Sequence, residues 1–179
     1  NPYADQHQPQ PEDPTDNAKS LSLLLAFGNF RFLTCGDLTW NVEAQLVTPK
    51  NPVGKLDLFM VTHHGLGGDK AGPRISNNPV LVWALDPVVT VMCNGPEKGG
   101  DLETQRTLRQ GKSIQAMFQL HRNVRLKPEE QTGKDFIAND GQTEGCTGTH
   151  VKLSVAPDGE SYTVQIGLDG KVREYKTRP

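Results

Sequence analysis

The sequence lacks long apolar runs and an excess of basic residues. None of its apolar stretches approaches the roughly 18–20 residues that cross a bilayer, and no signal-peptide pattern opens the chain. The formal net charge is −2, so the general positive field that nucleic-acid-binding proteins use is missing. These absences predict a soluble protein, cytoplasmic or secreted, and argue against a membrane or nucleic-acid partner.

Two kinds of catalytic or metal motif are also missing. The three cysteines, Cys35, Cys93 and Cys146, are widely spaced and form no Cys-x-x-Cys pair, which argues against a thiolate zinc site or a redox pair. No Gly-x-Ser-x-Gly occurs, so a serine esterase of the α/β-hydrolase type is not expected.

A chain of 179 residues is most simply organised as one domain that buries a core. Residues 1–19 are rich in Pro, Gln and Asp without an apolar period, which predicts an extended arm or linker. The domain proper spans 20–179. Within it, 124–149 contain few apolar residues and predict a long loop excursion, whereas 150–179 predict a β extension.

The remaining pattern predicts strands that alternate with helices. Residues 21–27 and 30–35 are β-type runs separated by Gly28-Asn29, a two-residue hairpin turn. The further predicted strands are 56–61, 88–92 and 114–120, and the predicted helices are 40–47, 79–85 and 101–111. The extension holds alternating runs at 150–155, 161–166 and 172–175. This order predicts an α/β fold, a mixed sheet with helices on one face plus a C-terminal β-hairpin extension.

Polar residues follow two of the predicted strands. Asp37 comes after the run 30–35 by way of Gly36, and His63 and His64 follow the run 56–61. Working residues of open α/β folds lie beyond the carboxyl ends of strands, and a carboxylate with imidazoles suits a divalent cation. The alternatives are that Asp37 is the acid at a helix N-terminus and that the two histidines are solvated loop residues.

Three further residues follow later strands. His121 and Arg122 end the run 114–120 and could supply an acid or an anion-binding group, or belong to a surface loop. Asn94 follows the run 88–92 and could orient a substrate, with a turn role as the alternative.

The order strand–Gly36-Asp37–helix, then strand–His63-His64-Gly65, resembles hydrolases of the metallo-β-lactamase superfamily, in particular the hydrolase domain attached to bacterial competence proteins. The resemblance covers about residues 20–120 and is carried by Phe-Arg-Phe-Leu-Thr-Cys-Gly-Asp-Leu, Leu-Asp-Leu-Phe-Met-Val-Thr-His-His-Gly-Leu and Pro-Val-Val-Thr-Val-Met-Cys-Asn. It implies the C-terminal half of a four-layered αββα sandwich. It also implies that Asp37 bridges two metals and that His63, or alternatively His64, ligates the second.

The sequence departs from that family at its principal motif. His-x-His-x-Asp-His and the single His upstream of Gly-Asp are absent, and Asn94 is followed by Gly-Pro rather than His-Pro. Either the first half of the fold was removed or the protein is truncated with altered chemistry. The family implies zinc. The donors that remain include the oxygens of Asp69 and Asp101, which makes Ca²⁺ or Mn²⁺ the alternative.

The expected function is metal-dependent hydrolysis of an ester or lactone, with metal-activated water and a small-molecule substrate. The alternatives are a phosphodiesterase of the competence-protein type and a non-catalytic remnant that acts as an interaction module. The sheet face that would meet the absent half should be apolar. We therefore expect a homodimer or a bound N-terminal fragment to cover that face.

Overall fold

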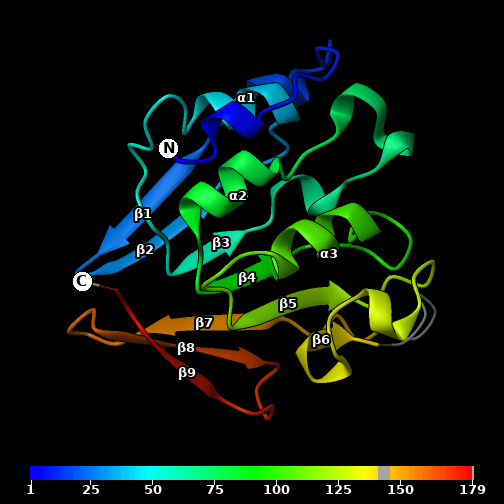
Figure 1. The fold of residues 1–179 in the computed structure, drawn as a ribbon. Helices are drawn as coiled ribbons and strands as arrows, with labels where there is room; N and C mark the ends of the chain where they lie inside the picture. Colours follow the sequence, from blue (N-terminus) through cyan, green and yellow to red (C-terminus); the bar gives the residue numbers. More distant parts are fainter. Residues whose placement is uncertain (141–145, 179) are drawn as a thin grey trace.

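In the computed structural model, residues 1–140 and 146–178 are described, apart from the side chain of Asp69. Six strands form one mixed sheet in which neighbours follow sequence order (Figure 1). They are β1 Leu23–Phe27, β2 Phe30–Thr34, β3 Leu58–Met60, β4 Val89–Met92, β5 Ala116–His121 and β6 Ile137–Asn139. The hairpin β1–β2 is antiparallel, as the turn Gly28-Asn29 predicts, and every other pair is parallel.

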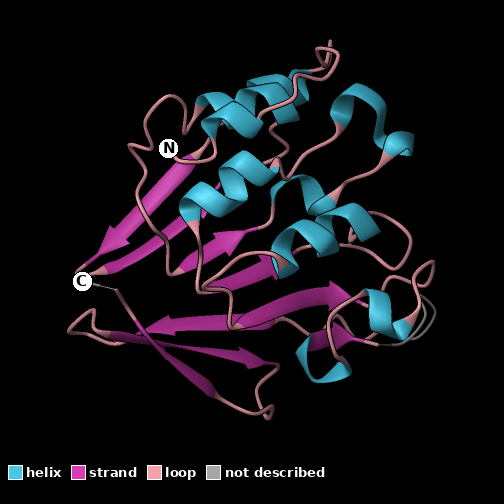
Figure 2. Cartoon of the chain, viewed as in Figure 1, coloured by secondary structure: helices cyan, strands magenta, loops and turns pink. Residues whose placement is uncertain are grey.

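The three α-helices lie on one face of this sheet, which confirms that part of the prediction (Figure 2). They are α1 Trp40–Gln45, α2 Pro79–Leu85 and α3 Leu102–Arg109. The side chain of Asn78 accepts a hydrogen bond from Val80 N at 2.9 Å, and Pro79 occupies the first helical position of α2. In the described part of the chain there are also six short 3₁₀ turns: Ala4–Gln6, Asp16–Lys19, Thr62–Gly65, Asp69–Arg74, Pro128–Glu130 and Lys134–Phe136.

A second sheet covers the opposite face. It consists of β7 Val151–Val155, β8 Ser161–Ile166 and β9 Arg173–Lys176, all antiparallel. Tyr162 of β8 is 1% exposed, donates its hydroxyl to Asp57 O at 2.9 Å and packs edge-on against Phe30 at 5.1 Å between ring centroids. The extension is therefore a three-stranded layer rather than a hairpin. This layer buries much of the apolar sheet face that we expected a second copy or an N-terminal fragment to cover.

The loop excursion predicted for 124–149 contains a strand, which corrects that prediction. Residues Ile137–Asn139 form β6, which lies parallel to β5 and pairs Gln119 with Ile137. Three residues are too few to show a period of two, so the strand carries no sequence signal of its own. Residues 141–145 of the excursion lie outside the described part of the chain.

The arm 1–19 lies along the helical layer (blue in Figure 1) and is only partly extended, because it contains the 3₁₀ turns Ala4–Gln6 and Asp16–Lys19. The ring of Tyr3 packs edge-on against Trp83 at 5.7 Å, and Gln8 O accepts a hydrogen bond from Trp40 Nε1 at 2.9 Å. His7 Nδ1 lies 3.0 Å from Asn78 Nδ2. These contacts attach the arm to α1 and α2. None of the helices in the described residues has the length and apolar character that a membrane crossing requires.

Candidate functional site

Asp37, His63 and His64 converge at the carboxyl edge of the main sheet. Asp37 follows β2 and the histidines follow β3, and because these strands are parallel neighbours their ends meet at one edge. Asp37 Oδ2 lies 3.9 Å from His63 Nε2, and Asp37 Oδ1 lies 3.7 Å from His64 Nε2. Each carboxylate oxygen thus faces its own imidazole, as the sequence predicts.

The backbone at the two histidines is strained. His63 and His64 both have left-handed conformations, with φ of 50° and 57°. Such a conformation costs a residue with a Cβ roughly 1–2 kcal/mol. Hydrogen bonds hold it in place: His63 N donates to Gly36 O at 2.9 Å and Gly100 N donates to His64 O at 2.9 Å. In this conformation both rings lie beside Asp37.

Carbonyl oxygens fix the tautomer of both rings. His63 Nδ1 lies 3.1 Å from Arg74 O and 3.2 Å from Ser76 Oγ, and His64 Nδ1 lies 3.0 Å from Cys93 O. A carbonyl can only accept, so each Nδ1 carries the proton when the ring is neutral. Each Nε2 then carries a lone pair, and the two atoms lie 3.9 and 3.7 Å from the oxygens of Asp37. This is the outer-shell arrangement that orients histidine ligands in metal sites.

Burial lowers the pKa of His63. Its side chain is 6% exposed, and desolvation lowers its pKa more strongly than the carboxylate of Asp37 raises it. The neighbouring charges of His64 and Lys98 lower the pKa further. The site nevertheless opens to solvent on one side, because Asp37 and His64 are 38% and 36% exposed.

The cluster has suitable donors but not the spacing of a loaded metal site. Ligands of one zinc ion lie roughly 3.3 Å apart at bonds of about 2.0–2.1 Å. The distances of 3.7 and 3.9 Å between the nitrogens and Asp37 exceed this by a few tenths of an ångström. Accordingly, no three His, Cys, Asp or Glu side chains in the described residues are arranged as a ready metal site.

The substrate-orienting role suggested for Asn94 is not supported. Asn94 is buried, and its amide bonds to the backbone, with Nδ2 donating to His121 O at 2.7 Å and to Gly95 O at 3.0 Å. This amide joins the ends of β4 and β5. The turn role is the one that the structure supports.

His121 and Arg122 lie at the same edge but apart from the cluster. Two strand spacings separate the ends of β3 and β5, about 10 Å. Arg122 Nε pairs with Asp140 Oδ1 at 2.8 Å, and in the described residues His121 Nδ1 is buried without a hydrogen-bond partner. No hydrogen bond or ion pair among those residues connects either side chain to Asp37.

Of the two additional oxygen donors, Asp101 is engaged away from the cluster. Asp101 accepts from Gly67 N at 3.0 Å and pairs with Arg125 at 2.7 Å. The side chain of Asp69 lies outside the described residues. A hollow of about 480 Å³ beside the histidine turn is lined by Leu66, Gly67, Gly68, Lys70, Ala71, Asp101, Leu102, Glu103, Arg125 and Leu126.

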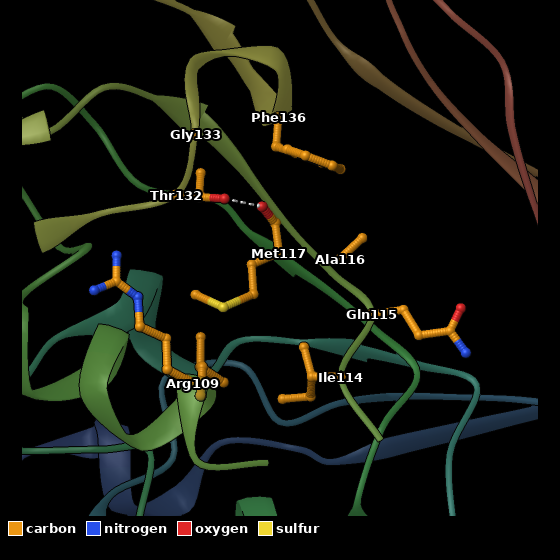
Figure 3. Close-up of a pocket in the computed structure, with 9 residues that line it drawn as sticks. Arg109, Ile114, Gln115, Ala116, Met117, Thr132, Gly133 and Phe136 are labelled. Carbon is orange, nitrogen blue, oxygen red and sulfur yellow. Dashed lines mark hydrogen bonds between the residues drawn. The ribbon is translucent and has the colours of Figure 1, made fainter. Parts of the chain in front are cut away.

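Another cavity, of about 280 Å³, lies away from this edge (Figure 3). It opens beside the start of β5, where Ile114, Met117 and Phe136 supply apolar walls. Two of its polar side chains are engaged: Thr132 Oγ1 donates to Met117 O at 2.7 Å, and Arg109 donates to Gln131 O at 2.6 Å.

The sequence reasoning missed the residues that support the site. Ser76 donates to Leu38 O at 2.8 Å while it faces His63 Nδ1, and Ser20 Oγ accepts from Asp37 N at 3.2 Å. Gly99 lies so close to His64 O that a Cβ would collide with it. None of these has a fixed spacing from the ligands, so no motif could have identified them.

Comparison with protein-family models, with curated proteins and with solved structures found no match.

Proposed function

We propose that Asp37, His63 and His64 bind one divalent metal ion and that the protein is a metal-dependent hydrolase of ester or lactone bonds. The observation that carries this proposal is that two unprotonated Nε2 atoms lie 3.9 and 3.7 Å from the oxygens of one carboxylate. The Nδ1–H bonds to carbonyls leave a lone pair on each Nε2 of the neutral rings. Without a cation or a proton between them, those lone pairs would repel the carboxylate.

Three protein ligands are the number that single-metal catalytic sites use. Two histidines and one carboxylate leave a position for water, whereas the two-zinc centre of the resembled family needs more donors than these. A bound ion would supply a water of lowered pKa and polarise the electrophile. Zinc fits the two imidazoles, and Mn²⁺ also accepts mixed nitrogen and oxygen ligands.

The residues of the cluster would have separate roles. His63 is buried and doubly held at Nδ1, which suits a fixed ligand. Asp37 is positioned through its backbone N–H by Ser20 and would hold the metal and orient the water. His64 is partly exposed, so it can act as a ligand or carry a proton to solvent.

One positive charge beside the cluster favours a second substrate class. Lys98 lowers the pKa of His63, whereas the adjacent hollow carries Lys70 and Arg125 together with Asp101 and Glu103. A cation beside the cluster attracts anions. Phosphodiesters, the substrates that the competence-protein resemblance implies, are therefore the second candidate.

We further propose descent from the C-terminal half of the metallo-β-lactamase sandwich. Supporting it are the turn Gly36-Asp37 after β2 and the turn His63-His64 after β3, on adjacent parallel strands. The sheet β7–β9 lies on the face opposite the helices, where that sandwich would carry its other sheet.

The test is hydrolysis of an aryl ester, a lactone and an aryl phosphodiester by the purified chain, with EDTA and then with Zn²⁺, Mn²⁺ or Ca²⁺. We expect turnover of at least one substrate that EDTA removes and one metal restores. Asp37→Asn should lower it at least about 100-fold. The matched control is Asp140→Asn, at the same edge but outside the cluster. Turnover that survives both EDTA and Asp37→Asn would overturn the proposal.

A further inference from the structure

Strand β1 is an uncovered apolar edge. All five residues of Leu23–Phe27 are exposed, by 47% at Leu23, 50% at Leu25 and 53% at Phe27, and Leu21 just before the strand is 84% exposed. The side chains of Leu23, Leu25 and Phe27 lie on one face of the strand, and those of Leu24 and Ala26 lie on the other. Both faces of the edge are therefore apolar.

The peptide groups of this edge are also unpaired. In a hairpin with a two-residue turn, the residues that flank the turn, here Phe27 and Phe30, exchange backbone hydrogen bonds, and so does every second residue before Phe27. The N–H and C=O groups of Leu24 and Ala26 therefore point away from β2. In the described residues, no backbone hydrogen bond from elsewhere reaches them. Edge strands of monomers usually carry a charge, a proline or a bulge that blocks pairing, and residues 20–27 contain no charge and no proline.

We infer that β1 pairs with β1 of a second copy of this chain, antiparallel and about a two-fold axis. The register that places Leu25 opposite Leu25 also places Leu23 opposite Phe27 on the same face, and Leu24 opposite Ala26 on the other. Every cross-strand pair is then apolar, and no like charges meet. The outward peptide groups of Leu24 and Ala26 face each other in this register and form about four new hydrogen bonds.

The area that such pairing can cover reaches the lower bound for a specific dimer. Leu21 and the four large side chains of β1 leave on the order of 500 Å² of apolar surface open, so two copies can bury at most about 1,000 Å². An isologous contact of this kind is the commonest in soluble oligomers. The inference does not depend on the metal site, because β1 contributes no residue to it.

The first test is the mass of the full chain in solution, by light scattering after gel filtration at about 50 µM. We expect twice the chain mass of 19.6 kDa. Leu25→Lys would place two ammonium groups opposite each other and should weaken the dimer at least about 100-fold, giving a monomer. Leu168→Lys is the matched control, because Leu168 is 74% exposed in the turn after β8 and lies outside β1.

The second test fixes the register without depending on the folding of a charged variant. In a Cys146→Ser background, Leu25→Cys should cross-link two chains under mild oxidation, since the two residues face each other across the axis. Leu23→Cys should not, because two copies of Leu23 lie about 13 Å apart along the strands. A monomeric wild-type chain, a Leu25→Lys dimer, or cross-linking by Leu23→Cys but not Leu25→Cys would each overturn the inference.

Discussion

A buried carboxyl group lies behind the histidine turn, on α1. Glu43 is fully buried, its Oε2 accepts from Asn78 N at 2.8 Å, and no described hydrogen bond reaches Oε1. Desolvation raises its pKa from 4.5 to about 7, more than these polar contacts lower it. The native state therefore binds a proton more strongly than the unfolded chain does.

The sign of the pH dependence follows from that difference. The stabilisation from Glu43 is fully present below its unfolded pKa of 4.5 and is lost as the pH rises through about 7. A shift of this size corresponds to about 3 kcal/mol. Glu43→Gln keeps the shape without the charge, so its stability relative to wild type should rise by about 3 kcal/mol from pH 4.5 to pH 8.

Urea unfolding of both proteins at several pH values measures this difference. Because other titrating groups are common to the two proteins, they cancel in the comparison. A difference that stays constant between pH 4.5 and pH 8 would contradict the buried, proton-binding state assigned to Glu43.

At the scale of elements, the turn Thr62–Gly65 depends on close backbone packing against the loop before α3. Gly99 has φ of 72°, and a Cβ there would collide with His64 O. Gly99→Ala should therefore shift the histidine turn and destabilise the fold by about 2–4 kcal/mol. Since that shift moves His64 Nε2, metal affinity should fall with stability.

Gly133 provides the matched control. Its φ is −64°, and nothing lies within 4 Å of the position of an added Cβ. Gly133→Ala should change the free energy of unfolding by less than about 0.5 kcal/mol. If the two alanine substitutions changed the free energy of unfolding equally in thermal or urea unfolding, the contact between Gly99 and His64 O would not exclude a side chain at position 99.

The sequence predicts the elements that have a period or a turn motif. Gly28-Asn29 identifies the β1–β2 hairpin, and Asn78 with Pro79 identifies the start of α2. The sequence also predicts that Asp37 and the histidines lie close together, because the carboxyl ends of parallel strands share one edge of the sheet. It does not predict β6, which is too short for a period. The isolation of His121 and Arg122 was missed for another reason: the distance between strand ends depends on strand order, which a single sequence does not specify.

At the scale of the whole molecule, β7–β9 acts as the second layer of the core rather than as an appendage. Tyr162 stacks on Tyr175 at 5.4 Å, packs against Phe30 of the main sheet and bonds through its hydroxyl to Asp57 O. Hydropathy alone predicts the strands of this layer. It cannot predict that they fold back onto the main sheet, since that depends on long-range packing.

Tyr162→Ala should therefore destabilise the entire fold. Loss of a buried aromatic side chain costs about 3–5 kcal/mol, whereas Tyr162→Phe removes only the hydroxyl and should cost about 1–2 kcal/mol. Urea unfolding followed by tryptophan fluorescence reports on the helical layer, because Trp40 and Trp83 both lie there. If Tyr162→Ala left that transition unchanged, β7–β9 would be an independent unit.

The account as a whole rests on one cluster, and calorimetric titration of the full chain with Zn²⁺ and Mn²⁺ tests it most directly. We predict one ion bound per chain, with affinity lowered about 10–100-fold or more in Asp37→Asn and in His64→Gln, and unchanged in Asp140→Asn. Binding should also weaken at acid pH, because protons compete for both Nε2 atoms. The absence of binding by either ion, or binding that both cluster variants leave unchanged, would contradict the assignment of Asp37, His63 and His64 as a metal site.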